Sequence, residues 1–312
     1  MRGPPGPPGP AGKDGSVAIK YYHADWGQAP EPVGEIPRPC PWTYAGAAGP
    51  WAWGRICKKE YAACGIGKSQ SPIDIAMNAL EWDGSLKPEQ QQTLGWHIPP
   101  TAATDFVYYV KGRLGGNTAE ESFDGHTFQV EHISATLEYD NVVYELKQFH
   151  MHTYSEHTFD GAHSDLEIQF VHTTRDHTAF NKELIVAAFF KVVAGQGSPT
   201  FLRQLIQSIP KLSDIPSKLV PLDFAEIAQT VMIGSIPHSG PSDRDFSPNF
   251  RNYLSYQGSF TTPPCKQGVQ WILLRNPVFI YGEDARDLHR LMGNNFRPAQ
   301  PLNGRTVWAT EP

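Results

Sequence analysis

Residues 147–172 read KQFHMHTYSEHTFDGAHSDLEIQFVH, and this stretch decides the fold. It holds two segments in which apolar and polar residues alternate, as is typical of β-strands whose residues two apart point to the same face. His150 and His152 therefore share one face of the first strand. Along the second strand, one face carries Glu167, Gln169 and Val171.

Two neighbouring strands of this kind can present His150, His152 and Gln169 to one point in space. A metal held by three histidines with an open fourth position would be a hydrolytic-type zinc site. Here the third residue is Gln169, and His172 is no substitute because it lies on the opposite face of its strand.

The remainder of the chain predicts a mainly β fold with a large, mostly antiparallel sheet and a few peripheral helices. Alternating or continuous apolar runs indicate strands at residues 128–140, 142–154, 165–173, 182–194 and 268–280. Residues 198–212 and 282–293 are predicted to be helical, the second helix ending at Gly293.

Glycine recurs at every third position in residues 1–17, with proline and alanine between, which is the G-X-Y period of collagen. We expect this segment to be the end of a longer stalk that joins the protein as an extracellular homotrimer. A short disordered tail or an engineered leader is the alternative. Residues 18–38 are a proline-rich linker, and residues 39–312 are the predicted globular domain.

The composition excludes several classes of partner. The net charge of −6 among 312 residues gives no reason to expect nucleic acid or an anionic membrane. No apolar run approaches the length of a membrane span. No apolar stretch follows Met1, so we expect a secretory signal peptide to lie outside this sequence. By themselves, four cysteines are compatible with two disulfides or with buried thiols.

Five sequence blocks, one of them inside the opening stretch, follow one another along the chain. They are WTYAGAAGPWAW (42–53), GKSQSPIDI (67–75), QFHMHTYSEHT (148–158), GSFTTPPCKQGVQWILL (258–274) and NFRPAQPLNGR (295–305). Together they resemble the α-class carbonic anhydrases over roughly residues 40–305. The resemblance implies a central, twisted, largely antiparallel sheet of about ten strands with short peripheral helices and an active-site cone.

The resemblance also implies roles for individual residues. His150 and His152 match the first two zinc ligands, and Gln148 and Glu167 match the groups that orient the metal ligands. Glu156 and Thr261 match a pair in which the carboxylate orients the threonine hydroxyl, and Thr262 matches a group on the bicarbonate side. His126 matches the proton-shuttle histidine. The apolar wall for carbon dioxide corresponds to Val171, Ile185, Phe260 and Trp271, and polar positions correspond to Tyr44 and Tyr256.

The cysteines gain partners from the same resemblance. Cys64 and Cys265 occupy positions where secreted members of the family carry a disulfide, which leaves Cys40 to pair with Cys57. Two disulfides would fit an oxidising compartment, as would a collagen-like stalk.

Gln169 is the departure from the family pattern, because it stands where the third zinc histidine is expected. An amide oxygen is a weaker zinc ligand than imidazole. Three outcomes stay open: no metal and no catalysis, weakened zinc with weak catalysis, or another metal. Several acatalytic proteins related to carbonic anhydrase share the loss of a zinc histidine.

These observations favour an extracellular structural, matrix or assembly protein whose carbonic-anhydrase-like domain has lost or strongly reduced catalysis. Other matrix proteins are then its possible partners. The alternative is a secreted zinc carbonic anhydrase that hydrates carbon dioxide with a metal held by His150, His152 and Gln169. A pocket for a small molecule or a glycan ranks last, since the sequence offers no basic patch for sulfated glycans.

Overall fold

A computed structural model describes residues 40–77, 81–82, 95–97, 119–123, 127–131, 133, 135–140, 142–174, 182–208, 218–220, 222, 224–234 and 253–309. The predicted collagen-like segment (1–17) and linker (18–38) lie outside the described residues, as does His126. The division of the chain into these segments and a globular domain therefore stays a prediction.

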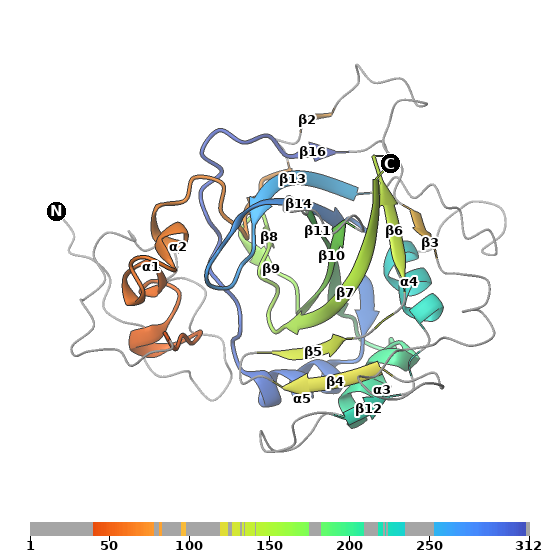
Figure 1. Ribbon diagram of the computed structural model, residues 1–312. Coiled ribbons are helices and arrows are strands. Elements are labelled where there is room, and N and C mark those ends of the chain that lie inside the picture. The colour runs from red at the N-terminus through yellow and green to blue at the C-terminus, as the bar shows by residue number, and fades with distance from the viewer. Residues whose placement is uncertain are drawn as a thin grey trace.

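A single large sheet dominates the structure (Figure 1). Ten of its strands follow the order β12-β4-β5-β7-β10-β11-β14-β13-β16-β2, while β15 pairs with β11, and β6 pairs with β3 and β7. The thirteen strands are β2 (Glu81–Trp82), β3 (Gly95–His97), β4 (Ala119–Phe123), β5 (Phe128–Glu131), β6 (Thr136–Tyr139), β7 (Val142–His152), β10 (Leu166–Thr174), β11 (Glu183–Val192), β12 (Lys218–Val220), β13 (Tyr253–Ser259), β14 (Gln267–Leu274), β15 (Val278–Ile280) and β16 (Trp308–Ala309). A small second sheet joins β1 (Asp74–Ile75), β8 (Thr158–Phe159) and β9 (Ala162–His163).

Most strand pairs are antiparallel. The exceptions are β11 with β14 and β15 and β16 with β2 in the large sheet, and β1 with β8 in the small one. The predicted mainly β fold with a largely antiparallel sheet is thus confirmed. The described part of the chain contributes more strands than the expected ten or so because several edge strands have only two or three residues.

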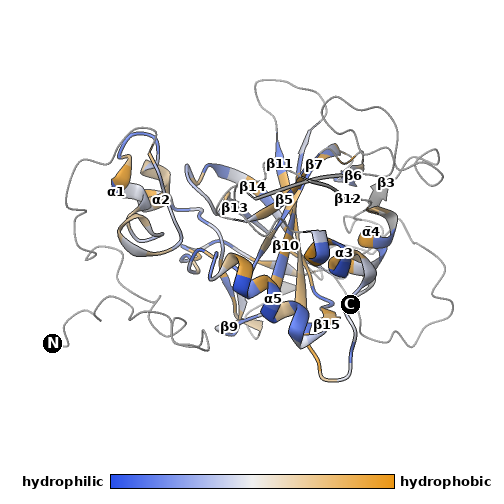
Figure 2. Ribbon diagram, turned by 90° about the horizontal axis from the view of Figure 1, so that it is seen from below, coloured by the Kyte–Doolittle hydropathy of each residue, from blue (hydrophilic) through white to orange (hydrophobic). Residues whose placement is uncertain are grey.

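The helices are short and lie outside the sheet. They are the 3-10 helix η2 (Gly46–Ala48) and the α-helices α1 (Trp53–Ile56), α2 (Ala62–Ile66), α3 (Thr200–Ser208), α4 (Phe224–Ile233) and α5 (Gly282–Met292). In both views, α1 and α2 lie together on one side of the sheet, apart from α3, α4 and α5 (Figure 1 and Figure 2). No helix in the described ranges is long and apolar enough to cross a membrane.

The two helices predicted from the sequence are present. α3 buries Phe201, Leu202 and Leu205, and α5 ends before Gly293, whose φ of +65° favours glycine. α4 was not predicted. Its sequence, FAEIAQTVMI, is apolar over much of its surface and gives no clear polar face.

The core lies on both faces of the sheet because alternate residues of each strand point to opposite sides. On one face, Phe149, Ile168 and Phe170 belong to the larger apolar cluster. On the other face, Val171 and Ile185 belong to a second cluster. The central strand β10 is buried along its whole length, so its polar residues must find partners inside the protein.

Candidate metal centre

β7 and β10 bring the three predicted metal-ligand positions together. The strands are antiparallel neighbours, with Gln169 opposite His150 and Glu167 opposite His152. The His150 Nε2 and Gln169 Oε1 atoms are 3.1 Å apart, and the ring centroids of His150 and His152 are 5.1 Å apart. The spacing along the two strands, read with their register, accounts for this meeting.

Hydrogen bonds fix the orientation of the His152 ring. Its Nδ1 lies 2.6 Å from the backbone oxygen of Asn295. A carbonyl oxygen only accepts, so Nδ1 carries the hydrogen and Nε2 carries a lone pair. This Nε2 atom is buried and makes no hydrogen bond with the described residues. A buried imidazole lone pair of this kind is what a metal ligand presents.

The Gln169 amide has a fixed orientation as well. Its Nε2 lies 2.9 Å from Glu156 Oε2 and 2.9 Å from Glu167 Oε1. Carboxylates accept hydrogen bonds, so the nitrogen must face them and the Oε1 atom must face His150.

His150 is flanked by two amide oxygens, Gln148 Oε1 at 2.9 Å from Nδ1 and Gln169 Oε1 at 3.1 Å from Nε2. Burial, and then the neighbouring His152, lowers the pKa of His150 to about 3, so its ring is neutral at physiological pH. A neutral imidazole donates only once. With Nδ1–H donated to Gln148, the Nε2 lone pair faces the oxygen of Gln169, as two ligands of one cation do.

The donor set therefore fits a divalent cation, with His150 Nε2, His152 Nε2 and Gln169 Oε1 as ligands. The third donor is an amide oxygen, which zinc prefers less than imidazole. Elsewhere in the described ranges, Cys40, Cys57 and Glu60 lie close enough together to share a metal ion, but these cysteines are bonded to each other.

Glu167 and Glu156 lie directly behind the ligands and are fully buried. Glu167 accepts from Gln169 and the His157 ring through Oε1, and from two backbone N–H groups through Oε2. Burial opposes its ionisation, but its interactions with His157 outweigh burial and lower the pKa of Glu167 below the ordinary value. Both carboxylates thus belong to the same polar network as Gln169.

The expected pairing of Glu156 with Thr261 does not form. Glu156 Oε1 accepts from the backbone N–H of Arg297 at 2.8 Å, and Oε2 accepts from the Gln169 amide. Among the hydrogen bonds of the described residues, none joins Glu156 to Thr261. The Gln169 amide has two N–H groups and donates to both carboxylates.

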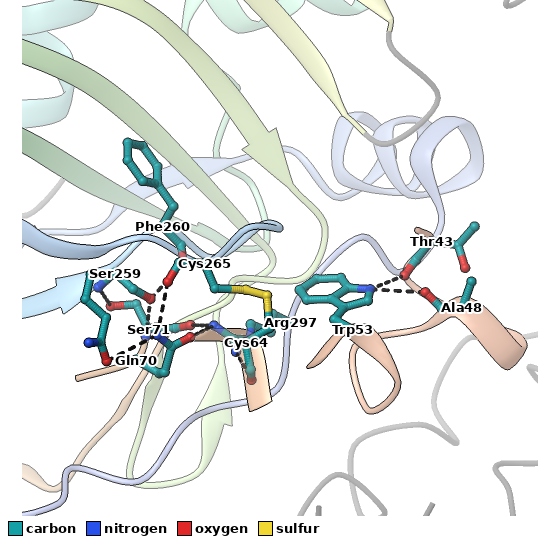
Figure 3. The surroundings of a disulfide bond; sticks show 11 residues. Thr43, Ala48, Trp53, Cys64, Gln70, Ser71, Ser259, Phe260, Cys265 and Arg297 are labelled. Carbon is teal, nitrogen blue, oxygen red and sulfur yellow. Dashed lines mark hydrogen bonds between the residues drawn. A yellow bond between two sulfur atoms is a disulfide. The ribbon is translucent and has the colours of Figure 1, made fainter. Parts of the chain in front are cut away.

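Thr261 and Thr262 lie in a turn that a disulfide holds in place. Cys64 and Cys265 are bonded, as are Cys40 and Cys57, so both predicted disulfides are confirmed. The Cys265 N–H donates to the Thr262 carbonyl at 2.8 Å. Figure 3 shows the Cys64–Cys265 bond next to the Arg297 and Trp53 side chains, with Gln70 and Ser71 nearby.

The predicted apolar wall is assembled from neighbouring strands. Val171, Ile185 and Trp271 lie side by side across β10, β11 and β14, and all three are buried in one cluster. Phe260 packs against this cluster, and its ring points away from the Cys64–Cys265 disulfide (Figure 3).

The two predicted tyrosines contact different histidines of the network. The Tyr44 ring centroid is 6.3 Å from that of His152. The Tyr256 hydroxyl lies 2.8 Å from Ser71 Oγ and 2.7 Å from His157 Nε2, and burial raises the pKa of Tyr256 well above its ordinary value. His157 therefore bonds to Glu167 and Tyr256 and has no nitrogen left for a metal.

Two further residues matter at this site and had no role assigned from the sequence. Asn295 orients His152 through its backbone oxygen, and Arg297 binds Glu156 through its backbone N–H. Both residues lie in the NFRPAQPLNGR block, so the family resemblance pointed to this segment. It could not assign their contacts, because backbone atoms are the same in every residue type and their positions depend on the path of the chain.

Comparison with known proteins agrees with this architecture. The family model described as "Eukaryotic-type carbonic anhydrase" matches residues 48–311. A carbonic anhydrase from Pectobacterium atrosepticum is 30% identical over 268 residues, covering 85% of this chain and 89% of that protein. Dioscorin DB3S from Dioscorea polystachya is 29% identical over 267 residues, covering 84% of both chains. The solved α-carbonic anhydrase of Thermovibrio ammonificans, in complex with sulfanilamide, superposes with a TM-score of 0.66 at 29% identity, covering 86% of this chain and 99% of that one. The chain therefore belongs to the eukaryotic-type carbonic anhydrase family.

Proposed function

We propose that this protein is an extracellular structural, matrix or assembly protein whose carbonic anhydrase domain has lost or strongly reduced hydration of carbon dioxide. One observation carries the proposal: the third donor at the candidate metal centre is the amide oxygen of Gln169, 3.1 Å from His150 Nε2. A neutral oxygen ligand in place of imidazole weakens the hold on zinc.

The remaining residues of the centre have separate tasks. Gln148 and Asn295 orient His150 and His152, and Glu167 orients Gln169. A zinc ion bound there would act as a Lewis acid that lowers the pKa of a coordinated water. The cluster of Val171, Ile185 and Trp271, with Phe260 packed against it, would offer the apolar surface for carbon dioxide.

The extracellular part of the proposal is supported by the disulfides. Two bonds link all four cysteines of the chain, which fits an oxidising compartment. The G-X-Y period of residues 1–17 supports association of three chains. Light scattering on the full-length protein tests this association. A trimer has three times the mass of one chain, and removal of residues 1–17 should reduce the measured mass to that of a single shortened chain.

A secreted zinc carbonic anhydrase is the second candidate function. It is favoured by His152 Nε2, which is buried without a hydrogen bond to the described residues, and by His150 Nε2, which lies 3.1 Å from Gln169 Oε1 and has a lone pair in the tautomer that donates from Nδ1 to Gln148. These atoms are oriented as zinc ligands would be even though the third ligand is not histidine.

Zinc content measured together with carbon dioxide hydration separates the two candidates. The unmodified protein, purified without added metal and again after zinc dialysis, is compared with Gln169→His. The matched control is Gln257→His, which adds a histidine at an exposed position of β13. We expect little zinc and little turnover in the unmodified and control proteins, and both to appear in Gln169→His. About one zinc per unmodified chain with inhibitable turnover would instead establish the enzyme.

A further inference from the structure

We infer that Gln169 is also a positioning residue, whose amide nitrogen draws Glu156 away from Thr261. The inference rests on the proposed function, because it concerns the same centre. It assigns the loss of activity to two effects of a single residue, a weaker ligand atom and a carboxylate that no longer orients the Thr261 hydroxyl.

The contacts of Glu156 carry the first step. Its Oε1 accepts from the Arg297 backbone N–H at 2.8 Å, and its Oε2 accepts from Gln169 Nε2 at 2.9 Å. His152 Nε2 lies 3.4 Å from the same Oε2 atom. Glu156 is 0% exposed and Thr261 is 3% exposed, so both residues are buried. No hydrogen bond joins Thr261 to Glu156 in the described part of the chain.

The chemistry of the side chain at position 169 carries the second step. An imidazole that binds a metal through one nitrogen has a single N–H left, which can serve only one carboxylate. A glutamine that presents its oxygen has two N–H groups, and here they serve Glu156 and Glu167 at equal distances of 2.9 Å. Charge-assisted hydrogen bonds are stronger than the neutral kind, so the amide holds Glu156 firmly.

This arrangement does not depend on whether a cation is bound. The oxygen of Gln169 faces His150, while the nitrogen faces the carboxylates from the other end of the amide group. A cation at the oxygen leaves both N–H groups where they are. The position of Glu156 can therefore be tested in protein that has been stripped of metal.

The test is nuclear magnetic resonance of the full-length protein labelled with 15N-glutamine, in the presence of a chelator. Gln169→His identifies the side-chain amide signals of residue 169 by their disappearance. We expect these signals to exchange slowly with water, to shift in Glu156→Gln, and to keep their positions in Thr261→Val. Rapid exchange, or an equal shift in Thr261→Val, would overturn the inference.

Thermal unfolding supplies a second measurement that does not need the Glu156 variant to fold. In the unmodified chain, Thr261→Val should lower the melting temperature by less than about 1 °C, because no hydrogen bond to Glu156 is lost. In the Gln169→His chain, where Glu156 is free to accept from Thr261, the same change should lower it by about 3 °C. Equal effects in the two chains contradict the inference. Carbon dioxide hydration by the zinc-loaded, unmodified chain tests the proposed function separately, and high activity there leaves these two readouts unchanged.

Discussion

Replacing Gln169 with methionine removes the amide while nearly conserving the side-chain volume. The substitution Gln169→Met takes away one donor to each of Glu156 and Glu167, together with the oxygen that faces His150. The residue is 1% exposed, so water cannot replace these contacts without opening the sheet.

The structure sets the size of the effect. Glu167 keeps three other hydrogen bonds, from the His157 ring and two backbone N–H groups. Losing the bond from Gln169 therefore reduces stability only slightly at Glu167. Glu156 Oε2 loses the one hydrogen bond that it accepts from the described residues, and a buried bond to a charged group is worth about 2 kcal/mol. Adding about 1 kcal/mol for Glu167 gives a destabilisation of about 3 kcal/mol, or a melting temperature lowered by about 6 °C.

The assay is denaturant and thermal unfolding in the presence of a chelator, so that cation binding does not enter. Gln148→Met is the matched control, because it removes a single hydrogen bond from a partly exposed amide and should cost about 1 kcal/mol. If Gln169→Met costs no more than Gln148→Met, the amide does not hold the two carboxylates and our account of the centre is wrong.

Three other predictions concern the scaffold. Replacing both Cys64 and Cys265 by serine opens a loop with a sequence separation of 201 residues, so chemical denaturation should show a loss of up to about 5 kcal/mol. Gly54→Ala should cost about 2 kcal/mol in the same assay, because a Cβ there would lie 2.6 Å from a backbone atom of α2, whereas Gly197→Ala, with nothing within 4 Å, should be nearly neutral. Burial lowers the pKa of His172 to about 3. Between pH 6.5 and 3, His172 therefore binds a proton in the unfolded chain but not in the folded chain, and the free energy of unfolding decreases as the pH falls. In His172→Gln, the slope of unfolding free energy against pH should therefore flatten by up to about 1.4 kcal/mol per pH unit, and an unchanged slope would contradict this assignment.

The sheet and the meeting of His150, His152 and Gln169 were predictable because they follow from local patterns. Alternation in the two strands specifies which residues share a face, and burial of one face fixes the register. Periodicity did not predict α4. Its apolar residues are spread around the helix because the helix is buried against the sheet, so no polar face marks it in the sequence.

The pairing of the cysteines followed from the family resemblance, since four cysteines alone allow three pairings. The contacts of Asn295 and Arg297 with the centre were not predictable residue by residue. Both residues act through backbone atoms that come from more than 100 positions away in the chain, and any residue type could supply such atoms.

Residue order alone established the strand pattern, the family and the presence of an amide where the third histidine is expected. Residue type and spacing are enough for these conclusions, because side-chain direction alternates in a strand. Only the tertiary structure decided which partner Glu156 takes. Gln169, Arg297 and Thr261 all belong to different segments, and the choice among them depends on distances and on how many N–H groups each can direct at one buried carboxylate.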